Sequence, residues 1–375
     1  MPLDINISLH SYRPHTEIKR GMLEIVCQGK DCNDQFLNSL GRIATERLAM
    51  YAFHIDLIDI PRINPETGYT GSVPFNNDYM RLRLKNTPLM NVDPGFAVLH
   101  EQYWKDVDYR LSDRPTHENE KKIEAYVDIK NEANISDIDD NILHVTTNDM
   151  KIYIDGVLSK LYSEKYPLLI ISLKPKEAFK CNMRAVLGVG LMDPSWFACS
   201  NFCYDQETLP DATILKMQSA SQFDEYVLVN RALEYFETRT KSLKDEIKRL
   251  YTSNSSNTDR FQIEIIDETH TMGEPINYEL QSHPNILKSS IIRPDLLIRR
   301  IIIDIIAINK EILLNSIMES MDNLITKINT FKKEFNKLRP ERENNKENNK
   351  ENKKENKKEN KKENKKENKT KSKRN

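Results

Sequence analysis

Residues 310–338 read KEILLNSIMESMDNLITKINTFKKEFNKL, and their apolar side chains recur at alternating spacings of four and three residues. Residues 223–251 show the same alternation. Each stretch predicts a long helix that buries one apolar stripe against another helix. The stripes are Val229, Leu233, Phe236, Thr240, Leu243, Ile247 and Leu250, then Leu314, Ile317, Met321, Leu324, Ile328, Phe331, Phe335 and Leu338. Either each helix packs on a core of its own, or the two pack on each other. Their matching positions favour the second interpretation.

The segments that precede the two helices follow a similar order. Before the first helix, the pattern predicts strands over 22–27, 52–60 and 214–217, a helix over 36–50, and a hairpin of strands 166–173 and 179–187. Before the second, it predicts strands over 261–266, 286–292 and 297–306 and a helix over 272–281 with Thr271 as its N-cap. A polar linker, residues 252–260, separates the two parts. The sequence therefore predicts an α+β chain built as an internal pseudo-dimer.

The near-neutral charge of the chain hides two opposite parts. The 375 residues carry a formal net charge of −1, with 30% charged residues and a mean hydropathy of −0.66. Residues 341–375 hold 15 Lys and Arg against 8 Glu, which leaves a net charge of −8 on residues 1–340. An acidic body argues against a protein whose main surface follows phosphates. The tail repeats Lys, Glu and Asn without apolar residues, so we expect it to be disordered.

Several functional classes lack their sequence signals. No apolar run approaches the roughly 18 residues of a membrane span, and the first residues show no secretory pattern. Five scattered cysteines fit a reducing compartment. The pairs Cys27/Cys32 and Cys199/Cys203 lack zinc-knuckle spacing, so buried thiols are favoured over a zinc site. His270 lies among acids, but a cap or turn role is favoured over a catalytic base, and no nucleophile–base set is present. Gly188 and Gly190 indicate a strand-end turn rather than a nucleotide loop.

Two blocks of sequence resemble one pair of families. The segments Asn38–Ile43 (NSLGRI) and Phe75–Leu84 (FNNDYMRLRL), with Pro88-Leu89, are similar to motifs of the alpha-like polypeptides of cellular RNA polymerases: bacterial alpha, its archaeal counterpart and the third subunit of eukaryotic polymerase II. The segment Asp267–Gly273 (DETHTMG), with His283-Pro284, resembles the eleventh subunit of polymerase II and its archaeal counterpart. These two families pair with each other, and nucleocytoplasmic large DNA viruses carry them fused.

The resemblance implies two homologous dimerisation halves. Residues 1–61 and 164–251 would form the alpha-like half, 62–163 an inserted α/β subdomain, 252–260 the linker, 261–338 the eleventh-subunit-like half and 339–375 the tail. The function implied is a non-catalytic assembly platform of DNA-directed RNA polymerase. Implied partners are the largest and second-largest subunits and small polymerase subunits, with DNA reached only through the complex and no membrane. The implied location is the virion and the viral factory in the host cytoplasm, or the nucleus if the chain is not viral.

The resemblance also implies a subunit interface, and this sequence departs from the family in places. The interface residues implied are Asn38, Ser39, Leu40, Arg42, Arg81 and Arg83. Gly41 replaces the first arginine of the family motif, and Glu274 replaces an asparagine. Residues 62–163 hold no cysteine, so the zinc of the eukaryotic third subunit is expected to be absent, with no other cofactor. Two alternatives remain open: an accessory transcription factor that binds nucleic acid through the basic tail, and an enzyme with a dispersed active site.

Overall fold

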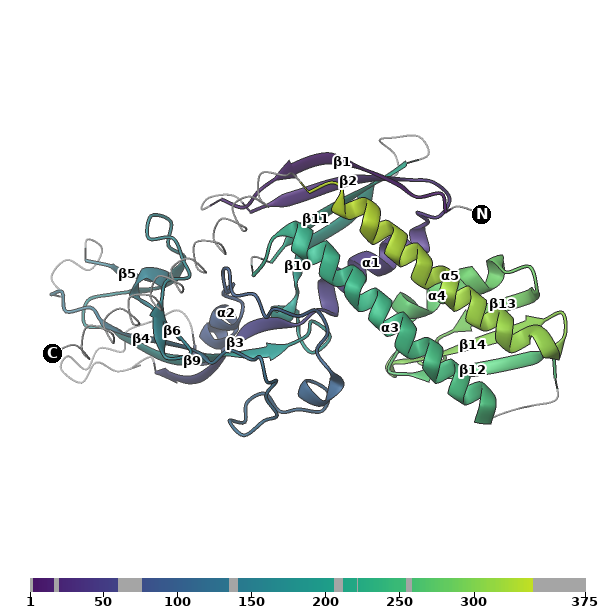
Figure 1. The fold of residues 1–375 in the computed structure, drawn as a ribbon. Helices are drawn as coiled ribbons and strands as arrows, with labels where there is room; N and C mark the ends of the chain where they lie inside the picture. Colours follow the sequence, from purple (N-terminus) through teal and green to yellow (C-terminus); the bar gives the residue numbers. More distant parts are fainter. Residues whose placement is uncertain are drawn as a thin grey trace, which may run out of the picture. The chain divides into compact units, whose positions relative to one another are not determined.

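The computed structural model describes residues 3–16, 20–59, 76–134, 141–205, 212–220, 222–253 and 258–339. Residues 1–332 form one compact unit, and all contacts discussed below lie within it. The predicted tail beyond Arg339 and residues 254–257 of the predicted linker lie outside the described residues. The fold is mixed α+β, with antiparallel sheets and five α-helices among the described residues (Figure 1).

The first antiparallel sheet has the strand order β1-β2-β11-β10. Its strands are β1 Asn6–Arg13, β2 Met22–Gln28, β10 Cys199–Asp205 and β11 Ala212–Ser219. Helix α1, Asp34–Glu46, packs on β10, and the long helix α3, Glu225–Ser253, follows β11 along the chain. Strands β1 and β10 were absent from the sequence prediction, because both alternate weakly and are mostly exposed.

A second antiparallel sheet repeats the connectivity of the first. Strands β12 Arg260–Ile266, β13 Ile286–Ile292 and β14 Arg300–Ala307 take the order β12-β14-β13, which corresponds to β2-β11-β10. Helix α4, His270–Ser282, lies between the first two strands along the chain, and helix α5, Lys310–Asn336, follows the third. The register also shifts near the start of both β10 and β13. The strand–helix–strand–strand–helix order therefore occurs twice. We call the two parts the repeated units: the first consists of β2, α1, β10, β11 and α3, and the second of β12, α4, β13, β14 and α5.

A five-stranded sheet with the order β3-β9-β4-β6-β7 forms the third part of the fold. It contains β3 Met50–Asp59, β4 Ile123–Lys130, β6 Lys151–Ile154, β7 Val157–Ser159 and β9 Ala178–Gly188. Strands β5 Leu143–Thr146 and β8 Leu169–Leu173 pair separately, and helix α2, Asn77–Lys85, packs on β3. The sheet takes strands from both sides of the boundaries expected at residues 61 and 163.

The predicted hairpin of residues 166–173 and 179–187 is wrong. Strand β8 pairs with β5, whereas β9 lies between β3 and β4. The segment between the two strands turns tightly, since the Glu177 N–H donates to the Lys174 carbonyl at 3.1 Å. The same segment bonds to the buried Asn131, just past β4, whose side chain donates to the Leu173 carbonyl at 3.0 Å and whose own carbonyl accepts the Lys176 N–H at 2.7 Å. The two strands thus meet at a turn but pair with different neighbours.

Other boundaries also differ from the prediction. Helix α1 ends at Glu46 rather than residue 50, because β3 already begins at Met50. Strand β14 begins at Arg300 rather than residue 297, and Leu297 is 94% exposed. The N-cap of α4 is Thr269, whose side chain accepts the Thr271 N–H, and not Thr271. Strand β4 lies in a segment for which the sequence pattern predicted no strand.

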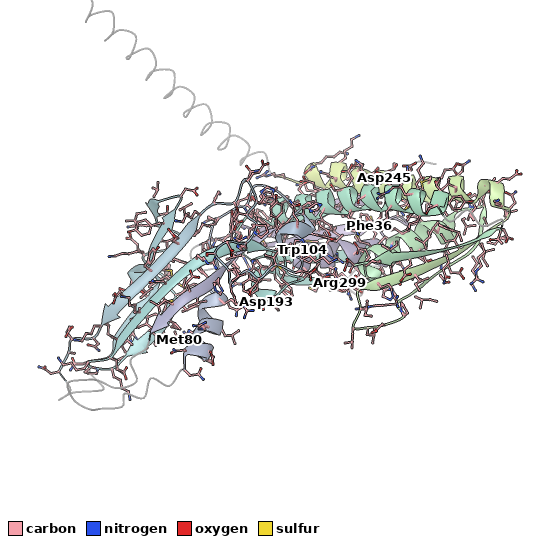
Figure 2. The ribbon with its side chains drawn as sticks, turned by 90° about the horizontal axis from the view of Figure 1, so that it is seen from below. Phe36, Met80, Trp104, Asp193, Asp245 and Arg299 are labelled. Atoms are coloured by element: carbon pink, nitrogen blue, oxygen red, sulfur yellow. The ribbon has the colours of Figure 1, made fainter. Side chains whose placement is uncertain are left out.

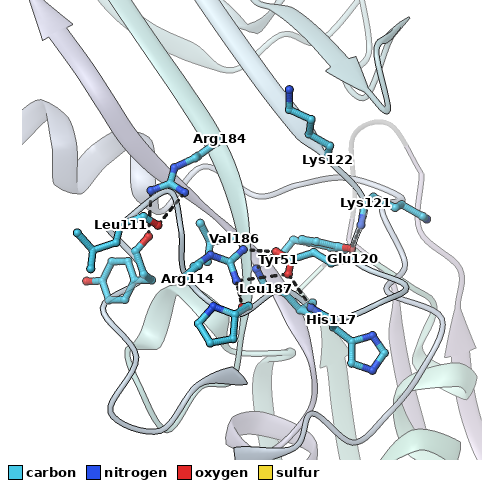
Figure 3. Close-up of polar contacts among 12 residues, drawn as sticks. Tyr51, Leu111, Arg114, His117, Glu120, Lys121, Lys122, Arg184, Val186 and Leu187 are labelled. Atoms are coloured by element: carbon cyan, nitrogen blue, oxygen red, sulfur yellow. Dashed lines mark hydrogen bonds and ion pairs between the residues drawn. The ribbon is translucent and has the colours of Figure 1, made fainter. Parts of the chain in front are cut away.

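A long irregular segment between α2 and β4 is held on the five-stranded sheet by polar contacts (Figure 3). Arg184 of β9 donates to the carbonyls of Arg110 at 2.6 Å and Leu111 at 3.3 Å. The buried pair Arg114–Glu120 is bonded in turn to the sheet, since Glu120 accepts the Leu187 N–H at 3.2 Å. These contacts with β9 fix the segment on the sheet although it has little regular structure.

Helices α3 and α5 run side by side, in opposite directions (Figures 1 and 2). Asn329 of α5 donates to Glu237 of α3 at 3.2 Å, and Lys244 pairs with Asp322. The buried stripe residues are Val229, Leu233, Phe236, Thr240, Leu243, Ile247, Ile317, Met321, Leu324, Ile328, Phe331 and Phe335. Leu250 is only half-buried, and Leu313 takes the buried place expected for Leu314.

Phe36 connects α1 to both long helices. Its ring lies 5.5 Å from that of Phe236 in α3 and 5.2 Å from that of Phe331 in α5, and it is 1% exposed. Aromatic pairs at such separations contribute about 0.5–1.5 kcal/mol beyond their buried area. Phe36 of the first repeated unit therefore packs on α5, the last helix of the second.

We predict that Phe36→Ala lowers the free energy of unfolding by about 3–5 kcal/mol, because the cavity opens between three helices. Denaturant unfolding followed by circular dichroism measures this. Leu82→Ala in α2 is the control, since Leu82 is 60% exposed and its loss should cost under about 0.5 kcal/mol. Equal effects of the two substitutions would contradict the packing role of Phe36.

Candidate interaction surface

Helix α1 presents one face to the core and one to a surface hollow. Asn33 caps the helix by accepting the Phe36 N–H at 2.9 Å. Asn38 is half-buried and Arg42 is exposed, one helical turn apart on the outward face. With Tyr204 of β10 and the first turns of α4 they line a hollow of about 240 Å³. The hollow is thus made by both repeated units.

The structure separates the residues expected at a subunit interface. Asn38, Ser39 and Arg42 all line this hollow, although Ser39 is 2% exposed. Leu40 lies fully in the core, so its side chain is not available to a partner. Arg81 is exposed on α2, and Arg83 of the same helix donates to the Leu169 carbonyl at 2.9 Å. The arginines of α2 therefore belong to a different element from the α1 surface.

Charged groups of both signs surround the hollow. His270, the first residue of α4, lies 2.8 Å from Glu274 through its Nδ1. The N-cap of α4 is Thr269 and not His270. His270 instead pairs with Glu274, one turn further along the helix. Asp34 and Arg42 complete the set on α1. The lining of the hollow is therefore polar and of mixed charge.

Gly41 allows α1 to pack closely on β10. A Cβ added at Gly41 would lie 2.0 Å from the Phe202 ring of β10. The helix can approach the sheet this closely only because residue 41 has no side chain. The site of the missing arginine is therefore a packing position in this chain, beneath Phe202.

Two buried ion-pair clusters join the repeated units, and the sequence patterns did not indicate either of them. Glu268, between β12 and α4, binds Arg47 at 3.3 Å and Arg239 of α3 at 2.6 Å. Lys327 of α5 binds Glu279 of α4 at 2.6 Å and Asp31, between β2 and α1, at 3.1 Å. Burial by itself lowers the pKa of Lys327, but the two carboxylates outweigh it and raise that pKa. Only the fold brings these distant charges together.

Neither a metal cluster nor a membrane helix is found in the part of the chain that the structure describes. Within it, no group of three or more His, Cys, Asp or Glu side chains could hold a metal ion. No described helix is both long and apolar enough to cross a membrane. Cys27 and Cys32 are buried free thiols, and Cys203 is exposed on β10.

Comparison with known proteins finds a distant relative in a giant virus. The chain is 24% identical over 297 residues to a protein of Acanthamoeba polyphaga mimivirus that is named "Putative DNA directed RNA polymerase subunit R470". The match covers 75% of this chain and 80% of the relative. No family model matches the chain.

We predict that Gly41→Ala destabilises the protein by about 1–3 kcal/mol, because the methyl group overpacks against Phe202. Helix propensity alone would predict the opposite change in stability, because it favours alanine over glycine by about 1 kcal/mol. Thermal unfolding measures the effect. Combining it with Phe202→Ala should recover much of the Gly41→Ala loss, as a double-mutant cycle shows. A Gly41→Ala protein that is more stable than the natural chain would exclude this contact as the reason for glycine.

Proposed function

We propose that this chain is a non-catalytic assembly-platform subunit of a multisubunit DNA-directed RNA polymerase of a large DNA virus. The observation that carries the proposal is the similarity to the mimivirus protein along most of both chains. The repeated fold supports the finer role, because a subunit that organises others needs surfaces rather than a reactive site. The motif resemblance at residues 38–43 and 267–273 supports the same role.

We further propose that the two repeated units form a pseudo-twofold dimer within one chain. The equal strand orders β2-β11-β10 and β12-β14-β13 support this, as does the side-by-side placement of α3 and α5. Residues 62–163, which supply β4, β6 and β7 of the five-stranded sheet, would be the inserted subdomain. Residues 252–260 would be the connection that replaces association of separate subunits. A short linker raises the effective concentration of the two units into the millimolar range.

The surface of α1 is the proposed docking site for the second-largest polymerase subunit. Asn38 and Arg42 project from it, and the charges of Asp34, His270 and Glu274 beside them provide complementarity to a polar partner. The second repeated unit would face the largest subunit. The acidic net charge of residues 1–340 supports protein partners over direct contact with DNA.

We predict that affinity purification of the tagged chain from infected cells recovers two very large polymerase subunits. Arg42→Glu should reduce recovery of the second-largest subunit about tenfold, because a like charge inside a polar interface is strongly unfavourable. Lys151→Glu, at an exposed position of β6, makes the same charge change as a control. Absence of large polymerase subunits from the natural complex would refute the proposed function. If deletion of residues 341–375 abolished transcription while Arg42→Glu did not, the result would support the alternative, an accessory factor that acts through its tail.

We predict that cutting the linker leaves the two units bound to each other. A protease site placed within residues 252–260 allows this cut in the purified full chain. The fragments should co-elute on size exclusion, because Phe36 and the two buried ion-pair clusters hold them. After denaturation and dilution, reassembly should become concentration-dependent, unlike that of the uncut chain. Immediate separation of the fragments would contradict an internal dimer.

A further inference from the structure

A second hollow, which we call the arginine hollow, lies where the two repeated units meet the irregular segment held on the five-stranded sheet. Its volume is about 380 Å³, within the range of about 300–1,000 Å³ typical of small-molecule sites. One wall is cationic and made by Arg47, Arg239 and Arg299. An apolar wall is made by Trp104 with Leu99 and Leu191. Figure 2 labels Trp104 and Arg299 near each other on this side of the molecule.

The apolar wall is preformed. Trp104 donates its indole N–H to the Leu99 carbonyl at 3.1 Å, which fixes the ring. Lys105, the next residue, pairs with Asp267 of the second unit. The contacts of Arg114 and Arg184 described above hold the same segment on the sheet. A rigid aromatic face is therefore available without rearrangement.

The carboxylates around the hollow are already engaged. Both oxygens of Glu268 are used, one by Arg47 and one by Arg239. Asp267 is bound by Lys105, and Glu101 lies 3.9 Å from the same ammonium group. Arg299 makes its hydrogen bond to a neutral group, the Asp267 carbonyl, at 3.1 Å. Among the described residues that line the hollow, Arg299 therefore forms no ion pair with a carboxylate of its own.

Two donors of the cationic wall are unsatisfied within the described part of the chain. The Nε atoms of Arg47 and Arg299 are both buried and have no hydrogen-bond partner, and the Arg47 side chain is 3% exposed. Buried donors normally have partners, so an orphan pair beside a hollow calls for an explanation. Burial, followed by the neighbouring charge of Arg47, lowers the pKa of Arg299. An anion in the hollow would offset the repulsion between these two guanidinium groups.

We propose that the arginine hollow binds a small amphipathic organic anion. Its apolar body would lie against Trp104 and Leu191, and its oxyanion, a carboxylate, phosphate or sulfonate, would meet Arg47 and Arg299. Guanidinium groups match such oxyanions in shape and charge. The site lies on both repeated units, so an occupant stabilises their contact. It does not depend on the proposed role in transcription, and its test uses the isolated chain.

The test uses 8-anilinonaphthalene-1-sulfonate as the anionic probe and N-phenyl-1-naphthylamine as a neutral probe of the same shape, both followed by fluorescence on the purified full chain. Arg299→Met should weaken binding of the sulfonate tenfold or more, since a charge-assisted contact is lost, and leave the neutral probe within about twofold. Arg300→Met is the matched control, because Arg300 pairs with Glu264 away from the hollow. Sulfonate binding that is unaffected by Arg299→Met, or equally affected by Arg300→Met, overturns the proposal.

A second variant and a stability measurement guard against a misfolded protein. Ser242→Trp at the rim of the hollow should block both probes while all the arginines remain. Without ligand, Arg299→Met should keep or raise the melting temperature, because it removes repulsion with Arg47. The natural chain should gain thermal stability from 1-naphthyl phosphate or 1-naphthoate, and the two competitors show which oxyanion is preferred. If Ser242→Trp binds the probes normally, or if neither competitor displaces the sulfonate, the hollow is not the site.

Discussion

The contact of Phe36 with Phe236 and Phe331 is the constraint on which the rest of the molecule depends. It requires α1 to lie against α3 and α5 together, so the short helix of one unit completes the core of the other. The surface formed by α1 and α4 exists only because the helices are held this way. The arginine hollow depends on the same arrangement, since Arg47 follows α1 and Arg239 belongs to α3. Both candidate sites are therefore products of the association of the two units.

The repeating seams of the long helices could be predicted because apolar spacing alone determines which face is buried. Most strands of the repeated units could be found for the same reason. Strands β1 and β10 could not, since exposed edge strands carry little alternation. The failed hairpin at 166–187 shows the limit clearly. Its sequence fits two paired strands, but β8 pairs with β5, and β9 lies between β3 and β4, which are far away in sequence. Strand pairing depends on such distant contacts, which local patterns do not contain.

The candidate sites, too, were predictable only where local sequence determines them. Asn38 and Arg42 could be proposed from a motif, and their outward spacing follows from helix geometry. The burial of Leu40 follows from that geometry as well, because a residue between two outward positions faces inward. The sequence carried no signal for three other features: Glu268 with its two arginines, Lys327 with its two carboxylates, and the apolar wall at Trp104. Charges far apart along the chain, such as Arg47 and Glu268, look like ordinary surface residues until the chain is folded.

The two ion-pair clusters have the same arrangement, with the roles of the two units exchanged. In each unit, an acid between the first strand and the short helix meets a base on the long helix of the other unit: Glu268 with Arg239, and Asp31 with Lys327. An acid–base pair of this kind would form equally well between two copies of either unit. The third members of the clusters differ, however, since Arg47 adds a positive charge to the first and Glu279 a negative charge to the second. Two copies of one unit would therefore bring together surplus charge of one sign, and only the pairing of unlike units balances it.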